Sequence, residues 1–448
     1  MGKLFGTDGV RGIANKELDC ELAMNLGRAA AIVLTEETHH RPKIVIGKDT
    51  RISSDMLEAA MTAGICSVGA DAIVLGFVPT PAVAFLVRKL GADAGVMISA
   101  SHNPAQYNGI KIFSGSGYKL SDSLEEKIEN IVLKSPDCQN KKDGADVGRV
   151  IKAETAVRDY IDYLKSTVDC DFSGLRVVVD CGNGSAAAIA PQLFEVTGGD
   201  FEIINASPDG LNINSGCGST HIEKLCEYVK NNGFDAGLAF DGDADRCLAV
   251  DENGCIIDGD RLIAIFADSL KKSGKLKNNT AVVTVMSNLG FFKFAEQYEI
   301  DVAKTNVGDR YVLEEMINGG YIIGGEQSGH IIFLDYGTTG DGELTAMQFL
   351  SILKKSGKKA SELSQLMECY PQVMVNVKVE KGDKNSILAE TDVTAAIKKA
   401  QTELADDGRI FVRASGTEPL IRVMVEGKSH KVIEKLANDI ALVIKSHV

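Results

Sequence analysis

The sequence lacks tryptophan, has little proline and contains no long apolar run. Of its 448 residues, 9 are proline and none is tryptophan. The longest uncharged apolar stretch, residues 72–87, is too short to span a bilayer and is interrupted by Pro79 and Pro81. The first residues, MGKLFGTDGVRG, contain no apolar signal-peptide segment, and Gly6 stands where a myristoylation signal requires Ser or Thr. We therefore predict a soluble, cytoplasmic protein without a membrane segment.

Cysteine spacing and net charge exclude further classes of protein. The ten cysteines form no C-x-x-C pair or zinc-finger spacing, and Cys66, Cys226 and Cys247 lie in apolar segments. Reduced thiols are therefore expected rather than disulfides or a zinc site. With 62 acidic and 48 basic residues, the formal net charge is −14. Nucleic acid and anionic membranes are not expected as partners, although local Arg and Lys clusters can still bind small phosphates.

The order of apolar segments predicts an α/β protein of several domains. Short apolar strands alternate with amphipathic helices, as in strand 43–47 and the helix that follows it. A polar stretch at 135–148 indicates the end of the first domain. The last part is predicted to be a smaller α+β unit, with one long helix at 387–404 between strands. The expected domains are 1–150, 151–255, 256–368 and 369–448.

Three segments share a pattern in which a short apolar run ends in a polar loop. They are GADAGVMISASHNP at 91–104, FDAGLAFDGDADR at 234–246 and GGYIIGGEQSGH at 319–330. Such self-similarity favours three duplicated α/β units, each presenting one loop. Chance similarity between strand ends is the alternative.

The segment 98–113, ISASHNPAQYNGIKIF, contains the candidate reactive residue, Ser101. The apolar run before it predicts a buried strand, and Pro104 prevents a helix across the polar residues that follow. Open α/β sheets bind ligands where loops leave such strands. A serine hydroxyl needs a base, a metal or prior covalent activation to react, and His102 is adjacent while Lys111 follows on the next apolar run. Taken alone, the loop fits equally well a solvated turn whose side chains cap the backbone.

An acidic cluster follows the second of these apolar runs. In DGDADR, Asp241, Asp243 and Asp245 occupy every second position. Alternate residues of an extended segment project to one side, so the three carboxylates can converge on one hard cation such as Mg²⁺. With Glu252 the spacing also resembles a calcium loop, but Arg246 stands where that loop requires glycine. A solvated acidic turn is the other alternative, although close carboxylates repel each other without a cation.

Two further loops carry polar groups suited to a sugar phosphate. EQSGH at 326–330 supplies donors and acceptors for sugar hydroxyls, and is weak evidence alone. A later turn combines hydroxyls, backbone amides and guanidiniums, which suit a phosphate dianion; its residues are Arg413, Ser415, Gly416, Thr417 and Arg422. An exposed β-hairpin with a solvated arginine is the alternative. Together the four loops indicate phosphoryl transfer to or from a sugar phosphate.

Five motifs, in this order along essentially the whole chain, resemble the α-D-phosphohexomutase family. They are FGTDGVRG at 5–12, ISASHNP at 98–104, DGDADR at 241–246, GGEQSGH at 324–330 and RASGTEPLIRVMVEG at 413–427. The resemblance implies three similar α/β domains with mixed sheets and a smaller C-terminal α+β domain around a central cleft. It is closest to the branch of the family that acts on glucosamine phosphates.

The resemblance also implies a role for each matching residue. Ser101 would be the phosphoserine and would join Asp241, Asp243 and Asp245 as a ligand of one Mg²⁺ ion. Groups around the reacting phosphate, which orient it or move protons, would be Arg11, His102, Lys111 and His330, with the general base left open. Glu326 and Ser328 would contact sugar hydroxyls. Further substrate contacts are expected from Arg246, Asp309 and Arg310, and the non-reacting phosphate would be held by Arg413, Ser415, Gly416, Thr417 and Arg422.

The implied reaction interconverts glucosamine 6-phosphate and glucosamine 1-phosphate through a phosphoserine enzyme and glucosamine 1,6-bisphosphate. It would supply amino-sugar nucleotide and cell-wall precursor synthesis. The expected partner is thus a small hexosamine phosphate, and the choice between monomer and homodimer is left open. The alternatives are a family member acting on mannose or glucose phosphates, a non-catalytic sugar-phosphate sensor and a metal-dependent phosphatase.

Two residues depart from the family pattern. Ala244 stands where the family commonly has glycine, so a positive φ there would cost on the order of 1 kcal/mol. Ala414 replaces a frequent proline, which is expected to loosen the phosphate-binding turn slightly. Neither departure removes a ligand.

Overall fold

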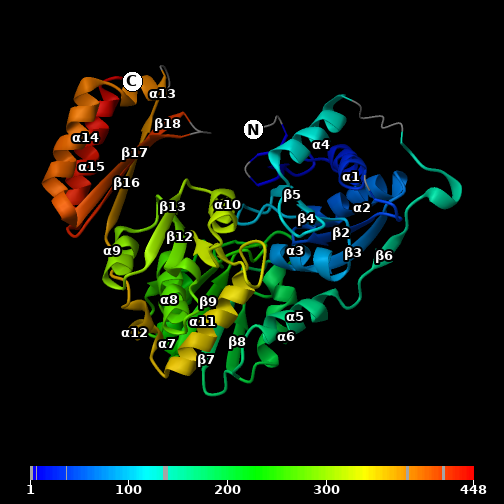
Figure 1. Cartoon of the computed structure of the whole chain (residues 1–448), viewed down its shortest axis with the longest axis horizontal. Coiled ribbons are helices and arrows are strands. Elements are labelled where there is room, and N and C mark those ends of the chain that lie inside the picture. The colour runs from blue at the N-terminus through cyan, green and yellow to red at the C-terminus, as the bar shows by residue number, and fades with distance from the viewer. Residues whose placement is uncertain (1–3, 7, 37, 135–139, 380–382, 416–418) are drawn as a thin grey trace. The chain divides into compact units, whose positions relative to one another are not determined.

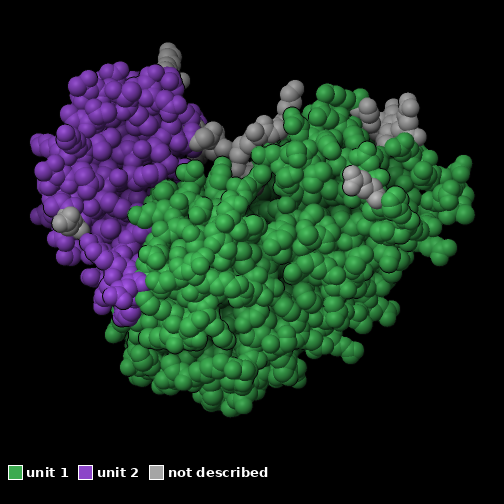
Figure 2. Space-filling view, in the orientation of Figure 1, with its two compact units in different colours: residues 1–286, 300–366 green, residues 287–299, 367–448 purple. Residues whose placement is uncertain are grey.

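The chain falls into two compact units, shown in Figure 2. The structure is a computed structural model and describes residues 4–6, 8–36, 38–134, 140–379, 383–415 and 419–448. Unit 1 comprises residues 1–286 and 300–366, and unit 2 comprises 287–299 and 367–448. No helix within the described ranges is long and apolar enough to cross a membrane.

Unit 1 begins with a six-stranded sheet in the order β1-β5-β4-β2-β3-β6 (Figure 1). Its strands are β1 (Val10–Ile13), β2 (Lys43–Lys48), β3 (Asp71–Phe77), β4 (Ala94–Ile98), β5 (Tyr107–Ser114) and β6 (Val150–Lys152). Its helices are α1 (Cys20–Leu34), α2 (Ile52–Ser67), α3 (Thr80–Lys89) and α4 (Asp122–Lys134). β4 is buried along its whole length, because α1, α2 and α4 pack on one face of the sheet and α3 packs on the other. β6 pairs with β3, so this sheet extends past residue 150.

Two more sheets complete unit 1. The second has the order β11-β10-β9-β7-β8 and the third β13-β12-β14-β15. The elements around the second sheet are α5 (Ala156–Ser166), β7 (Arg176–Asp180), α6 (Ala190–Glu195), β8 (Asp200–Ile204), α7 (Glu223–Asn232), β9 (Ala236–Phe240), β10 (Cys247–Asp251) and β11 (Ile256–Ile257). Those of the third are α8 (Gly259–Lys272), β12 (Thr280–Thr284), β13 (Asp301–Thr305), α10 (Asp309–Gly319), β14 (Ile323–Gly325), β15 (Ile331–Phe333), α11 (Gly342–Ser356) and α12 (Ala360–Ser364).

The three sheets repeat one local arrangement. In each, a buried strand leads into a polar loop and the chain returns as an antiparallel neighbour, in the pairs β4–β5, β9–β10 and β14–β15. The three returning loops carry Ser101, the aspartate triplet and Glu326. All three sheets also contain parallel pairs, so the prediction of several α/β units with mixed sheets is confirmed.

Unit 2 is a smaller α+β body built on a three-stranded antiparallel sheet, β16-β18-β17. Its elements are α9 (Leu289–Gln297), β16 (Gln372–Lys378), α13 (Lys384–Leu388), α14 (Thr391–Leu404), β17 (Gly408–Ala414), β18 (Leu420–Gly427) and α15 (His430–Lys445). The predicted long helix near 387–404 is present as α14, but it begins at Thr391, and residues 384–388 form the separate short helix α13. Glu390 between them has extended backbone angles, with φ −60° and ψ 142°.

Candidate active site

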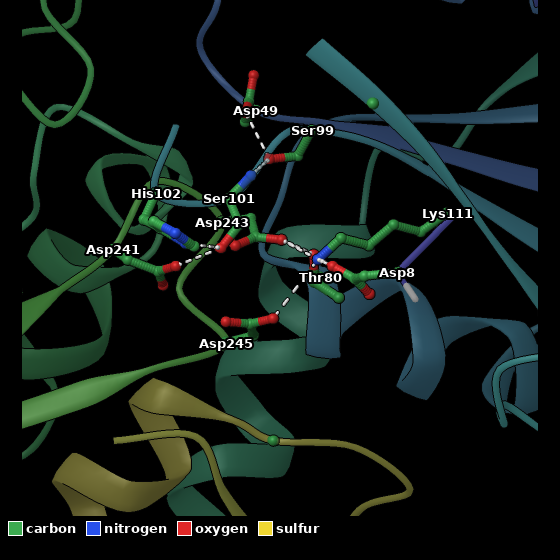
Figure 3. Close-up of polar contacts among 12 residues, drawn as sticks. Asp8, Asp49, Thr80, Ser99, Ser101, His102, Lys111, Asp241, Asp243 and Asp245 are labelled. Carbon is green, nitrogen blue, oxygen red and sulfur yellow. Dashed lines mark hydrogen bonds and ion pairs between the residues drawn. The ribbon is translucent and has the colours of Figure 1, made fainter. Parts of the chain in front are cut away.

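Ser101 lies in the loop between β4 and β5 with its hydroxyl directed at the acidic cluster (Figure 3). It is 2% exposed, and its φ of 52° falls in a region that residues other than glycine rarely occupy. The Ser99 hydroxyl accepts a hydrogen bond from the Ser101 N–H at 2.9 Å. Ser101 Oγ donates to Asp241 Oδ2 at 2.6 Å and lies 3.4 Å from His102 Nδ1. A residue of the first sheet therefore meets the aspartate loop of the second.

The aspartate triplet forms a compact, buried group of oxygens. One carboxylate oxygen from each of Asp241, Asp243 and Asp245 lies within 4.8 Å of the others. Oδ1 of Asp243 and Oδ1 of Asp245 have no hydrogen-bond partner among the described residues. Burial, followed by repulsion from Asp245 and Asp243, raises the pKa of Asp241 to about 8. Unpartnered carboxylate oxygens that repel each other fit a hard divalent cation such as Mg²⁺.

Ala244, in the loop that carries the aspartate triplet, has a positive φ. Its φ is 52° and its side chain is fully buried. The condition under which alanine is less favourable than glycine is therefore met, at a cost on the order of 1 kcal/mol.

Lys111, on β5, is the cation nearest to the triplet. Its Nζ lies 2.7 Å from Asp243 Oδ2, 3.1 Å from Asp8 Oδ2 and 3.5 Å from Asp245 Oδ2. Thr80 donates a hydrogen bond to Asp243 Oδ2 at 2.5 Å. Although burial opposes it, these carboxylates raise the pKa of Lys111 well above its usual value. Lys111 therefore carries a positive charge at neutral pH. Figure 3 shows its side chain directed at Asp8 and Asp243.

His102 is held neutral beside the reactive serine. Burial, and then the guanidiniums of Arg246 and Arg11, lower its pKa to about 4. Arg246 Nη1 lies 3.1 Å from His102 Nδ1; because a guanidinium can only donate, Nδ1 is the acceptor and the ring proton is on Nε2. Arg11, on β1, forms an ion pair with Asp8. Ser101 thus lies beside a neutral imidazole that is itself in the field of two arginines.

His330 lies on the other side of the triplet and is 3% exposed. Its Nε2 accepts a hydrogen bond from the Gly340 N–H at 3.2 Å, so its proton is on Nδ1, which lies 3.7 Å from Asp245 Oδ2. Asp309 Oδ2 lies 3.7 Å from Nε2. The ring of His330 therefore supports Asp245, and the expected role at the reacting phosphate stays a prediction.

Asp309 and Arg310 begin α10 and are both engaged in ion pairs with the first part of the chain. Asp309 and Asp8 share the ammonium group of Lys119. Arg310 pairs with Asp122. These ion pairs join the loop after β5 and the start of α4 to the start of α10. Substrate contacts by Asp309 and Arg310 stay predictions.

The loop after β14 presents Glu326 and Ser328. Glu326 is half-buried, and its Oε1 accepts a hydrogen bond from the Gly308 N–H at 3.0 Å. Ser328 is exposed. Their expected contact with sugar hydroxyls stays a prediction.

Unit 2 carries the expected phosphate-binding residues. Arg413 on β17 and Arg422 on β18 are directly opposite each other in the antiparallel pair. Ser415 follows β17 and is 6% exposed. Gly416 and Thr417 lie outside the described residues. The two arginines therefore occupy neighbouring backbone positions, which is compatible with both side chains binding one phosphate.

Sequence reasoning missed several residues that structure this site. Asp8 lies inside the FGTDGVRG motif, three residues before Arg11, and this acid–arginine spacing was a signal that could have found it. Thr80 and Lys119 gave no signal in the sequence, because their partners are far along the chain, at separations of 163 residues for Thr80 and 190 for Lys119.

Sequence models of four domains match the chain in order. They are described as Phosphoglucomutase/phosphomannomutase alpha/beta/alpha domain I (residues 2–137), domain II (158–254), domain III (258–370) and the C-terminal domain (374–443). The chain belongs to the phosphoglucomutase/phosphomannomutase family. A relative from Acetivibrio thermocellus, named phosphoglucosamine mutase, is 54% identical over 448 residues, which is 100% of both chains.

Solved structures of this family share the fold. A phosphoglucomutase/phosphomannomutase family protein from Burkholderia thailandensis superimposes with a TM-score of 0.80 at 23% identity, covering 99% of this chain and 97% of that one. An N-acetylphosphoglucosamine mutase from Aspergillus fumigatus, in complex with GlcNAc-6P and magnesium, has a TM-score of 0.62 at 19% identity, covering 95% of this chain and 99% of that one. At these identities the likeness concerns the fold.

Proposed function

We propose that this chain is a phosphoglucosamine mutase, which interconverts glucosamine 6-phosphate and glucosamine 1-phosphate. The observation that carries the proposal is the 2.6 Å hydrogen bond from Ser101 Oγ to Asp241, one member of the buried triplet. A serine oxygen beside a divalent-cation site meets the requirement for moving a phosphoryl group onto and off that serine. The name of the 54% identical relative supports the choice of glucosamine phosphate as substrate.

Asp241, Asp243 and Asp245 would hold one Mg²⁺ ion, with the Ser101 oxygen as a further ligand. The ion, when bound, neutralises negative charge on the phosphoryl group that Ser101 carries. The magnesium and sugar phosphate named in the fungal structure support this assignment.

The catalytic cycle has two phosphoryl transfers, both at Ser101. In the first, the bond from phosphorus to Ser101 Oγ breaks and a bond to the free hydroxyl oxygen of glucosamine 6-phosphate forms, which makes glucosamine 1,6-bisphosphate. The bisphosphate then reverses its orientation, and Ser101 Oγ takes the phosphoryl group from the 6-position. Glucosamine 1-phosphate leaves, and the phosphoserine is restored.

The charge of each group beside Ser101 determines its role in the reaction. Lys111 is held as an ammonium by its carboxylate partners, so it can stabilise negative charge on the moving phosphoryl group. His102, with a pKa of about 4, is neutral at pH 7, and because its Nδ1 accepts from Arg246, its Nε2–H can donate a hydrogen bond to a phosphate oxygen. The proton that leaves the sugar hydroxyl in the first transfer passes to the 6-oxygen in the second. Arg11 and Arg246, the two arginines beside His102, can bind phosphate oxygens.

Substrate preference tests the proposal. The ratio kcat/KM is measured with the 6-phosphates of glucosamine, glucose and mannose, each with catalytic 1,6-bisphosphate and Mg²⁺. The proposal predicts the highest ratio for glucosamine 6-phosphate. A higher ratio for glucose or mannose phosphate would place the chain in another branch of the family, and release of free phosphate as the main product would mark a phosphatase.

A further inference from the structure

The buried guanidinium of Arg51 forms hydrogen bonds with the backbone of the loop that carries Ser101. Arg51 is 1% exposed and donates four hydrogen bonds through its side chain. Its Nη2 donates to the carbonyl oxygens of Ser101 at 2.9 Å and Asn103 at 2.8 Å, and its Nη1 donates to that of Pro104 at 2.6 Å. Its Nε donates to Asp49 Oδ2 at 2.9 Å. One side chain therefore fixes three of the four peptide carbonyls between residues 101 and 104.

Asp49, which pairs with Arg51, is linked to the backbone N–H of Ser101. Asp49, fully buried, accepts a hydrogen bond from Ser99 Oγ at 2.6 Å through Oδ2. Ser99 Oγ in turn accepts the N–H of Ser101 at 2.9 Å. The Asp49–Arg51 ion pair thus holds Ser101 by its N–H through Ser99 and by its carbonyl directly, as Figure 3 shows for the Asp49 side.

Ser101 needs such support because its backbone is in the left-handed region, with φ 52°. An L-residue other than glycine rarely keeps this conformation unless the surroundings enforce it. A second hydrogen bond to the Ser101 carbonyl comes from Asn214 Nδ2 at 3.0 Å. With the backbone fixed in this way, the side chain of Ser101 is directed at Asp241 and not at solvent.

We propose that Arg51, paired with Asp49, is a positioning residue of the phosphoryl-transfer reaction. It holds Ser101 Oγ in line with the aspartate triplet before and after each transfer. Arg51 does not touch the reacting atoms, and acts only through the loop backbone. Arg51 also immediately precedes α2, so the competing explanation is that it merely stabilises the fold.

The test is Arg51→Lys, which keeps the positive charge but replaces the several N–H donors of the guanidinium with one ammonium group. Arg51→Lys cannot reach three carbonyls and Asp49 at once. The matched control is Arg41→Lys, because Arg41 also pairs with an aspartate, Asp71 at 3.0 Å, and donates to the carbonyls of Ala145 and Val147. Arg41 precedes β2, whereas Ser101 follows β4, which runs parallel beside β2. The control therefore lies at the opposite ends of these strands from Ser101.

The rate measured is phosphorylation of Ser101 by glucose 1,6-bisphosphate, followed by intact mass in quenched samples, together with kcat and KM for glucosamine 6-phosphate. We expect Arg51→Lys to lower the phosphorylation rate and kcat about 10- to 100-fold, the usual effect of a misplaced reacting group, with KM within about twofold of the wild type. Arg41→Lys should leave all three within about twofold. A phosphorylation rate for Arg51→Lys within twofold of the wild type would overturn the proposal, and so would an equal loss in Arg41→Lys.

A second variant decides the matter if Arg51→Lys does not fold. Ser99→Ala removes only the link between Asp49 and the Ser101 N–H, and should lower the phosphorylation rate about three- to tenfold, the kinetic equivalent of one hydrogen bond. An unchanged rate in a folded Ser99→Ala protein would contradict the proposal. The inference rests on the proposed function, and the two fail differently: an inactive wild type refutes the function, whereas an active wild type with fully active variants refutes only the role of Arg51.

Discussion

Substitution of Gly242 by alanine tests whether the serine loop and the metal loop must meet at one fixed distance. A Cβ at this position would lie 2.5 Å from the Ser101 carbonyl oxygen and 2.8 Å from Asn214 Nδ2. Contacts to a Cβ stay above 3.0 Å in proteins, so the two loops would have to separate by about 0.5 Å. The backbone at Gly242 has no positive φ, and the strain of the variant is therefore purely steric.

The expected cost has two parts. Overpacking of a buried site lowers the free energy of unfolding by about 1–3 kcal/mol. The displacement of Ser101 Oγ from Asp241 is expected to lower kcat about 10- to 100-fold, since a shift of about 1 Å in a reacting group can cost 100-fold. Urea unfolding and steady-state turnover of glucosamine 6-phosphate measure the two effects separately.

Gly337→Ala is the matched control, because a Cβ there meets only the Thr339 carbonyl at 3.7 Å, an ordinary contact. It should keep both stability and kcat near the wild-type values. If Gly242→Ala turns over as fast as this control, the serine loop and the metal loop need not meet at one fixed distance.

Three further predictions concern the charges around the site. Lys119→Met leaves the half-buried carboxylates of Asp8 and Asp309 without their shared cation, and should lower the free energy of unfolding in urea by about 1–2 kcal/mol, against less than about 0.5 kcal/mol for exposed Lys127→Met; similar losses in both would contradict a stabilising role of this ion pair. Burial raises the pKa of Glu125 to about 7, so the folded state binds its proton more tightly than the unfolded state and stability falls as pH rises from about 4.5 to 7. Glu125→Gln should remove this fall, about 1 kcal/mol after allowance for partial exposure, and unchanged pH dependence of the melting temperature would argue against it. Chelation with EDTA should abolish turnover and Mg²⁺ should restore it while raising the melting temperature, because the ion relieves repulsion in the aspartate triplet; activity that survives chelation would exclude the metal site.

The parts of this protein that sequence reasoning reached are those whose signal is local. Asp241, Asp243 and Asp245 share one short segment, so their alternation was enough to predict that their oxygens converge. Ser101 was found because an apolar strand ends just before it. The strands β4, β7 and β9 were recognisable because both faces of their sheets are covered, which makes β4 and β9 apolar throughout and gives β7 a run of three valines.

The parts that were missed depend on distant partners or on weak apolar patterns. Arg51 looks like an ordinary polar residue before a helix until its three carbonyl partners, some 50 residues later, are known. β13 was not predicted because its sequence, DVAKT, is partly polar, and only Thr305 of its five residues is buried. The break between α13 and α14 was missed because residues 388–391 contain no glycine or proline, so the helical pattern runs through them.

The central claim is that the hydroxyl of Ser101 carries the phosphoryl group between the two positions of the sugar. The most direct test is the intact mass of the protein after incubation with glucose 1,6-bisphosphate and Mg²⁺, for the wild type and for Ser101→Ala. We expect the wild type to gain one phosphoryl group, located on Ser101 by peptide mapping, and the variant to gain none and not to turn over. Equal phosphorylation of both proteins, or a variant that still interconverts the two sugar phosphates, would contradict it.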